Sequence, residues 1–479
     1  MYIFPEKDEQ TNSYQISCQK GASAMSRLLT NLHRLHTEKG SGRLFEELND
    51  LFKDSFDYVC TKIGNSCDNE VYLCYFATLS LNSRLHFAFD EDESSLAIRL
   101  KEYEGTPISE GDTKKCELAL CSGSAVLFLR GSATGLILDL QEVQQRSLDS
   151  PFTETVLQGP LYAFNENLEV NAALIRQRIR TSQLKAWETT VGRSTNTRIF
   201  VIYCADVVDE SCLAQVKKLL TEMDVEGIQD TGELLRLLDK KRYMRLFPKA
   251  ILTERPDRVT SDLLRGKLTI LVDGSPFALV LPAVYTDFWH SPEDSYVNPY
   301  VSVFQNTLRF LAMTVNLVLP AFYVALTSIN VDVNRLEISL AAAASREGVP
   351  YPVFIETMLM LIMIDFITEA GTRLPKAISS TVTMVGGVVL GQAIIQANIV
   401  SNLLVIIVAA TAIANFIVID YQMGLVQRVL KYFTVVGAAV AGVLGIVFCL
   451  ACLVFYLSSL ESFGTPYLTS LLPRKGGRK

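Results

Sequence analysis

Three carboxylates, Glu356, Asp365 and Glu369, lie in the apolar run that occupies the middle of the segment from Ser345 to Ile378. An ionised group deep in hydrocarbon costs about 2.5–3.5 kcal/mol on insertion scales, so such groups usually face a bundle interior, a water path or a partner chain. Positions 365 and 369 are four residues apart and share one face of a helix. Position 356 lies about 2.5 turns earlier, near the opposite face. The spacing therefore predicts one acidic pair and one separate carboxylate.

Basic residues flank the same run, with Arg346 before it and Arg373 and Lys376 after it. Two interpretations stay open: the carboxylates pair with these cations and lock a helix bundle, or they line a path for cations. The preceding apolar stretch, residues 336–344, carries Glu337 near its start. Because it is too short to cross a bilayer, it indicates a re-entrant segment or a half-helix.

A second polar stripe follows in residues 385–402, where Gln392 and Gln396 are four residues apart among several glycines. Such a stripe can line a pore or bridge helices. With the two asparagines that follow, eight residues are candidates for an ion path or for a polar bundle core: Glu337, Glu356, Asp365, Glu369, Gln392, Gln396, Asn398 and Asn402.

The elements that would position these residues form a membrane domain over residues 301–460, since a crossing needs about 20 apolar residues. We expect four to six spans, and the basic clusters flanking them favour an even number. Residues 421–432 read as an amphipathic helix, with Arg428 and Lys431 on one face. The expected crossings are Phe310–Ile329, Val353–Ala370, Val382–Ala397, Leu403–Ile419 and Phe433–Leu457.

The preceding residues repeat one plan twice. Glycines recur eight apart at Gly123 and Gly131 and again at Gly266 and Gly274, and each second glycine is followed by serine between two apolar runs. A strand, turn and strand with a positive backbone angle at the same place explains this spacing. The sequence thus predicts an α/β cytoplasmic region of two tandem related modules, followed by an all-α polytopic membrane domain.

The predicted organisation has six parts: an N-terminal tail and helix (1–44), module 1 (45–150), a linker helix (151–189), module 2 with a joint (190–300), the membrane domain (301–460) and a basic C-terminal tail (461–479). The linker carries Arg176, Arg178 and Arg180. A solvated basic face is the favoured interpretation, and contact with an acidic surface or anionic lipid is the alternative. Residues 253–258, TERPDR, indicate a capped turn with ion pairs.

Several function classes are excluded by composition and motifs. A net charge of −7 and a pI of 5.4 argue against nucleic acid as a partner. Neither module carries a phosphate-binding, dinucleotide-binding, nucleophile-elbow or zinc-protease motif, so we expect no enzyme activity, cofactor or metal. The N-terminus lacks an apolar core segment, which places the modules on the cytoplasmic side. The ten cysteines read as reduced packing residues.

Long ordered motifs between about Gly159 and Pro466 carry a family resemblance, which is looser over residues 45–150 and missing from 1–44. The motifs are GPLYAFNENLEVNAALIRQRIRT, VGRSTNTRI, LTERPDRV, LVDGSPFALVLPAVYTDFWHSPEDSY, LPAFYVAL, SREGVPYPVFIE, EAGTRLPKAI, VGGVVLGQAIIQANIVS and SFGTPYL. With them the chain resembles the A subunit of GerA-type spore germinant receptors.

The resemblance implies an integral protein of the inner spore membrane whose N-terminal region faces the spore core. It implies a transporter-like B subunit and a lipoprotein C subunit as partners, and self-association around a pore that releases cations when nutrient is sensed. The chain departs from the family at Asp365, where Glu is usual, and near Ile419, where Pro is frequent. Alternatives are a SpoVAF-type germination accessory protein, a non-conducting scaffold for the receptor, or a secondary transporter.

Overall fold

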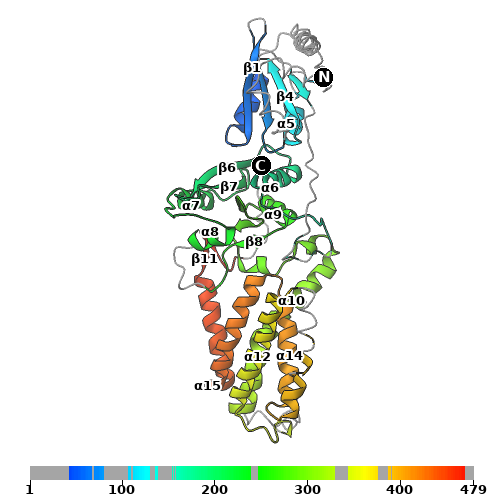
Figure 1. Cartoon of the computed structure of the whole chain (residues 1–479), viewed down its shortest axis with the longest axis vertical. Coiled ribbons are helices and arrows are strands. Elements are labelled where there is room, and N and C mark those ends of the chain that lie inside the picture. The colour runs from blue at the N-terminus through cyan, green and yellow to red at the C-terminus, as the bar shows by residue number, and fades with distance from the viewer. Residues whose placement is uncertain are drawn as a thin grey trace, which may run out of the picture.

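The computed structural model describes residues 43–66, 69–79, 106–108, 112–129, 135–138, 151, 154, 156, 158–238, 246–329, 344–375, 384, 387–389 and 391–469. The candidates Glu337 and Lys376, the expected re-entrant stretch up to residue 343, and nearly all of the predicted N-terminal tail lie outside these ranges. Figure 1 shows an elongated molecule in which module 1, module 2 and a helical bundle follow one another along the long axis.

Module 1 is a five-stranded antiparallel sheet with helices α2 (Arg43–Phe52) and α5 (Thr113–Cys121) packed on one face. The strand order is β1-β2-β4-β5-β3, which leaves β1 and β3 at the edges. The strands are β1 (Tyr58–Ser66), β2 (Asn69–Phe76), β3 (Thr106–Ile108), β4 (Ala125–Leu129) and β5 (Gly135–Leu138).

Module 2 has the same topology, with the strand order β6-β7-β9-β10-β8, as the predicted repeat requires. Separate clusters of buried side chains cover the two faces of this sheet, which explains why its strands read as continuous apolar runs. The elements are α6 (Leu168–Arg178), β6 (Leu184–Val191), β7 (Thr197–Cys204), α7 (Glu210–Thr221), α8 (Thr231–Leu238), β8 (Ile251–Thr253), α9 (Pro256–Leu264), β9 (Leu268–Val272) and β10 (Ala278–Leu281).

The expectation of a solvated basic face was wrong for Arg176, whereas Arg180, just after the helix, is exposed. Helix α6 packs on the sheet of module 2, and Arg176 is only 3% exposed. Its guanidinium makes two bonds to Asp57 of module 1, Nε to Oδ2 at 2.5 Å and Nη2 to Oδ1 at 2.7 Å. Ser55 and Thr78 donate to the same carboxylate, each at 2.8 Å. The helix therefore fixes module 1 to module 2 through a buried, fully hydrogen-bonded ion pair.

The helical bundle follows two short 3-10 turns, Tyr285–Phe288 and Pro292–Ser295. Two of its helices, α10 with its π-helical extension (Pro299–Ile329) and α15, are long and apolar enough to cross a membrane. Described residues thus support membrane association, while the expected four to six crossings stay a prediction. The helices are α10 (Pro299–Val324), α12 (Val353–Arg373), α14 (Asn402–Phe416) and α15 (Tyr421–Ser459).

Helix α15 is a hairpin, so the expectation of one straight crossing over residues 433–457 was wrong. The chain breaks at Gly442, where φ is 61° and ψ is −139°. A Cβ on Gly445 would lie 1.9 Å from the carbonyl oxygen of Gly437, although eight residues of helix rise about 12 Å. The Cys449 thiol also lies 3.7 Å from the Phe433 carbonyl oxygen. The two arms therefore fold back on each other through a glycine contact.

This contact predicts that Gly445→Ala disrupts the hairpin. The added methyl meets backbone that cannot rotate away, and overpacking of this kind costs about 1–3 kcal/mol or more. The matched control is Gly424→Ala in the first arm, where a Cβ would meet open space. Because alanine favours helix by about 0.5–1 kcal/mol, the control should melt at or above the wild-type temperature. Equal melting temperatures for the two variants in detergent would contradict the glycine contact.

The chain returns to module 2 after the hairpin, in the short pair β11 (Glu461–Ser462) and β12 (Thr465–Pro466). Tyr467 is fully buried there and donates its hydroxyl to the Pro248 carbonyl at 2.7 Å. The Tyr285 amide donates to the Tyr467 carbonyl at 2.9 Å. The far end of α15 and the start of the bundle are therefore held on the same module.

Candidate functional site

Glu356 lies in the first turn of α12 with its side chain fully buried. Its Oε1 accepts from the Ser401 amide at 2.6 Å, and its Oε2 lies 3.4 Å from Nε of Arg346. Ser401 is the N-cap of α14, and its hydroxyl is 3.0 Å from the hydroxyl of Tyr323 in α10. A carboxylate at a helix N-terminus is favoured by the helix dipole. Glu356 therefore joins three helices at the end of the bundle away from the modules.

Asp365 lies in the middle of α12 and binds two side chains of α15. Lys431 Nζ is 2.9 Å from Oδ1, and the Tyr432 hydroxyl donates to Oδ2 at 2.5 Å. The Lys431 side chain is almost fully buried. Sequence reasoning missed this partner because it assigned Lys431 to a basic amphipathic face. The presence of a lysine among apolar residues, with Gln427 four residues before it, is the signal that could have indicated it.

Glu369 does not form a joint acidic site with Asp365. It pairs with Arg373 four residues later, Nη2 to Oε1 at 2.7 Å, and these side chains are 45% and 78% exposed. Asp365 and Glu369 share the helix α12, but each faces its own cation. The structure thus brings Glu356 and Asp365 into the bundle at two separate levels and leaves Glu369 at its surface.

The four candidate amides, Gln392, Gln396, Asn398 and Asn402, are all exposed. A Cβ on either neighbouring glycine, Gly387 or Gly391, would meet open space. Together these residues form what we call the amide face of the bundle. It lies between α12 and α14 in the chain, and Asn402 is the first residue of α14.

A different set of amides occupies the bundle interior. Asn316 of α10 is fully buried and donates to Asn415 of α14 at 3.1 Å and to Gln427 of α15 at 3.0 Å. In the sequence, Asn316 stands out only as an amide within an apolar run. An interhelical amide cluster of this kind holds helices together where apolar surface offers no net attraction.

The buried ion pair at Asp365 does not border an open path within one chain. The cavity beside Asp365 and Lys431 has a volume of about 10 Å³, which is room for one water at most. Its walls include Leu361 and Val408. Within the described residues, the polar groups at this level of the bundle therefore act as a packed contact between helices.

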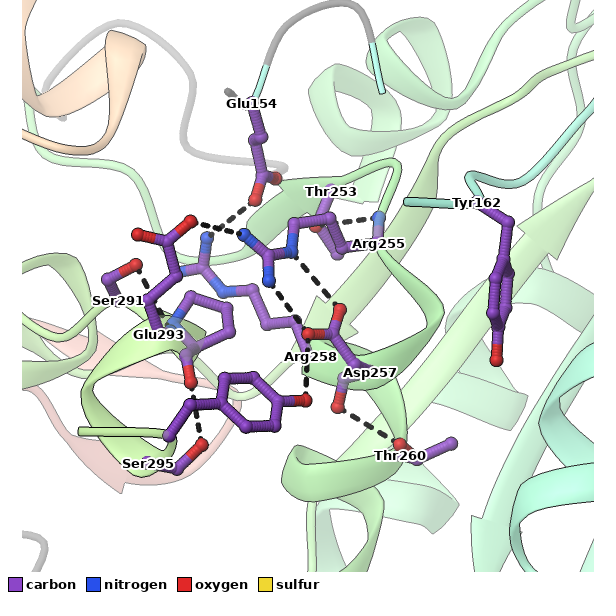
Figure 2. Close-up of polar contacts among 12 residues, drawn as sticks. Glu154, Tyr162, Thr253, Arg255, Asp257, Arg258, Thr260, Ser291, Glu293 and Ser295 are labelled. Atoms are coloured by element: carbon purple, nitrogen blue, oxygen red, sulfur yellow. Dashed lines mark hydrogen bonds and ion pairs between the residues drawn. The ribbon is translucent and has the colours of Figure 1, made fainter. Parts of the chain in front are cut away.

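A second polar cluster lies at the joint between module 2 and the bundle (Figure 2). The TERPDR motif places Arg255 just before α9, where it is 2% exposed. Its guanidinium donates to Asp257 at 3.1 and 2.8 Å and lies 3.4 Å from Glu293. Tyr296 also donates to Asp257, at 3.3 Å. The cluster links α9 to the turn that leads into α10.

Further ion pairs extend this joint on both sides. Lys267 lies 3.1 Å from Asp262 and 2.9 Å from Asp287, with all three side chains buried. Arg309, about two fifths of the way along α10, lies 2.6 Å from Asp294. These pairs therefore connect module 2, the two 3-10 turns and α10.

The joint should weaken in acid. Burial raises the pKa of Asp257, but the hydrogen bonds and charge of Arg255 outweigh it and hold this pKa below its ordinary value. Unfolded aspartate has a pKa of about 3.9. The stabilisation is therefore present above that pH and is lost as the pH falls through the lower folded value. In Asp257→Asn, the melting temperature at pH 7 should be lower and should fall less between pH 5 and pH 2. An unchanged pH dependence would contradict this role.

Comparison with known proteins gives a consistent set of matches. Residues 46–478 match the family described as Bacillus/Clostridium GerA spore germination protein. Spore germination protein B1 of Bacillus subtilis is 36% identical over 76% of this chain and 75% of that protein. Spore germination protein A1 of the same organism is 34% identical over 83% and 84%. The N-terminal domain of the A subunit of the Bacillus megaterium spore germinant receptor GerK3 is 21% identical, with a TM-score of 0.36 over 50% of this chain and 94% of that one.

Proposed function

The chain belongs to the GerA family of spore germination proteins, and we propose that it is the A-type subunit of a nutrient-responsive germinant receptor. In this proposal several copies surround a pore in the inner spore membrane, and the pore releases cations when nutrient is sensed. The partners are a transporter-like B subunit and a lipoprotein C subunit. No catalytic step is part of the proposal.

The directions of the helices support an even number of crossings. Helices α12 and α14 run in parallel, since Glu356 meets Ser401 at their beginnings and Thr368 and Asn415 line one cavity near their ends. A return of the chain between them, together with α10 and the two arms of α15, would make six crossings. The docking of residues 461–467 on module 2 supports an even number. In the proposal, the modules face the spore core.

The observation that carries the pore is the amide face. Asn398 and Asn402 lie beside Ser401 at the end of the bundle, whereas Gln392 and Gln396 precede that end. Exposed against lipid, the two glutamine amides would be left unsatisfied, at a cost of several kcal/mol for each group. The open space at Gly387 and Gly391 also lets another helix approach closely. If the amide faces of several copies surround a hydrated path, water solvates the amides and the copies can pack closely at the glycines. Glu356 and Asp365 then hold the helices of each bundle together through their polar contacts.

Cysteine cross-linking tests this arrangement. In a Cys452→Ser background, Gln396→Cys should give linked oligomers when membranes are oxidised, because the amide faces of neighbouring copies meet. Val440→Cys is the control, since residue 440 is 78% exposed and lies two residues before the break of the α15 hairpin at Gly442. Cross-linking at 440 but not at 396 would contradict the arrangement.

The pairing of Glu356 with Arg346 and of Asp365 with Lys431 favours a second candidate, a non-conducting scaffold that anchors the receptor. A SpoVAF-type accessory role is compatible with the same family membership. A secondary transporter would require uptake of substrate without partner subunits. Making the amide face apolar separates the pore from the scaffold. The change leaves the fold intact, so it should abolish nutrient-triggered cation release only if the amide face lines the path.

A further inference from the structure

Two cysteines of module 1 lie directly opposite each other on neighbouring strands. Cys60 of β1 and Cys74 of β2 are register partners in the antiparallel pair. Opposed residues in such a pair have Cβ atoms about 4.5–5.5 Å apart and point to the same face. A disulfide joins Cβ atoms about 3.5–4.5 Å apart, so a small adjustment is enough to bring the sulfurs into bonding distance.

The two thiols differ in exposure in a way that suits thiol exchange. Cys60 is half-buried on β1, which is an edge strand, whereas Cys74 is fully buried on β2. A hydrogen bond from Cys74 lowers the pKa of the Cys60 thiol. The same contact and burial raise the pKa of Cys74. Cys60 is therefore the accessible nucleophile, and Cys74 is the partner that can resolve a mixed disulfide.

Module 2 shows that the sheet does not need sulfur at this position. Alignment of the two modules pairs Cys60 with Ala186 and Cys74 with Ile202, which are themselves register partners in β6 and β7. The same fold is thus built with ordinary apolar residues. A metal site is not indicated, because no group of three or more metal-binding side chains occurs in the part of the chain that the structure describes.

We propose that Cys60 and Cys74 form a redox-active dithiol, which closes to a disulfide when module 1 meets a low-molecular-weight disulfide as oxidant. The Cys60 thiolate attacks one sulfur of the oxidant and releases the first thiolate. Cys74 then attacks Cys60 Sγ, and its proton goes to the second departing thiolate. In total, two cysteine thiols and one oxidant disulfide give one protein disulfide and two small thiols, so that electrons and protons balance.

The bond would pin edge strand β1 to β2 and close a loop of about 15 residues, which restricts the unfolded chain. Module 1 should therefore become more resistant to unfolding when oxidised. The edge strand lies beside Asp57, which is the residue that Arg176 holds, so this change is placed next to the contact between the modules.

The test uses the full chain in detergent, treated with oxidised glutathione, then alkylated and mapped by mass spectrometry without reduction. We expect a peptide pair linked through residues 60 and 74, and an upward shift in melting temperature that a reducing agent reverses. Cys60→Ser should abolish both, and it is a mild change at a half-buried site. Cys74→Ala should instead trap glutathione on Cys60.

A free dithiol, dithiothreitol, in a parallel sample provides the control for the oxidant. The proposal is overturned if that dithiol is oxidised while residues 60 and 74 remain alkylatable. It is equally overturned if Cys60 links to Cys67, which lies outside the described residues, or if glutathione stays on Cys60 while Cys74 remains free.

Discussion

Replacing Arg176 with alanine should lower the free energy of unfolding by about 3–5 kcal/mol, since it leaves a buried carboxylate without its cation. The Asp57 side chain is 1% exposed and would keep only the hydroxyls of Ser55 and Thr78 as donors. Removal of the guanidinium also takes away its stacking on the Phe76 ring, whose centroid lies 4.3 Å from Cζ. Urea unfolding of the full chain in detergent, followed by the fluorescence of Trp187 and Trp289, measures the loss.

Arg193→Ala is the matched control for this change. Arg193 also makes a two-bonded pair with an aspartate, Asp224, but their side chains are 74% and 65% exposed. Exposed pairs contribute about 0–1 kcal/mol, so this variant should be nearly neutral. Asp57→Ala combined with Arg176→Ala should be less destabilised than the sum of the single changes. Equal decreases in the free energy of unfolding for Arg176→Ala and Arg193→Ala would show that the contact between the modules does not depend on the Arg176–Asp57 pair.

The second large effect is expected at Lys431, where methionine keeps the length of the side chain and removes its charge. Among the described residues, the variant leaves Asp365 with the Tyr432 hydroxyl as its remaining partner. Removing one partner of a fully buried pair costs about 3–5 kcal/mol, and the loss should be somewhat smaller here because the Asp365 side chain is 22% exposed. The melting temperature in detergent should drop sharply. Adding Asp365→Asn should recover most of it, because the pair is then neutral and an amide can still accept from Tyr432.

Arg373→Ala, in the same helix as Asp365, serves as the control. Its pair with Glu369 is an exposed contact four residues apart, which contributes about 0.3–0.5 kcal/mol. A small decrease in the melting temperature of this variant, together with a large decrease for Lys431→Met, would support a structural role for the Asp365 pair. If Lys431→Met melted at the wild-type temperature, Asp365 would be solvated without its lysine. The pair would then not hold the bundle together.

Much of the soluble fold could be predicted from local pattern. The glycine spacing indicated two strand pairs, and the structure has β4 and β5 in one module and β9 and β10 in the other. Because a strand's apolar run and its turn residues are close in sequence, their pattern is readable without knowledge of the partner strands. The shared strand order of the two sheets follows from the same repetition.

The contacts between distant segments could not be predicted in this way. Arg176 sits on a helix that reads as solvated, and only the docking of module 1, more than a hundred residues earlier, buries it. The break of α15 has a similar cause. Glycine is common in membrane helices, and the fold-back becomes apparent only when Gly437 and Gly445 are seen in contact.

Polar residues in the bundle show the same limit of sequence reasoning. Gln392 and Asn316 have the same signature, an amide within an apolar run, yet the first is exposed and the second fully buried. Whether such an amide is buried or exposed depends on a hydrogen-bond partner on another helix. Lys431, rather than any of the expected cations, pairs with Asp365 for this reason.

The most direct test of the account is nutrient-triggered cation release from spores in which this chain carries one of two double changes. Gln392→Leu with Gln396→Leu makes the amide face apolar, whereas Asp365→Asn with Lys431→Met removes the charges of the buried pair. With both variants present at wild-type levels in the membrane, we predict that the first abolishes cation release and the second retains it. Release that persists in the first variant and fails in the second would contradict a path between amide faces and would place it at Asp365.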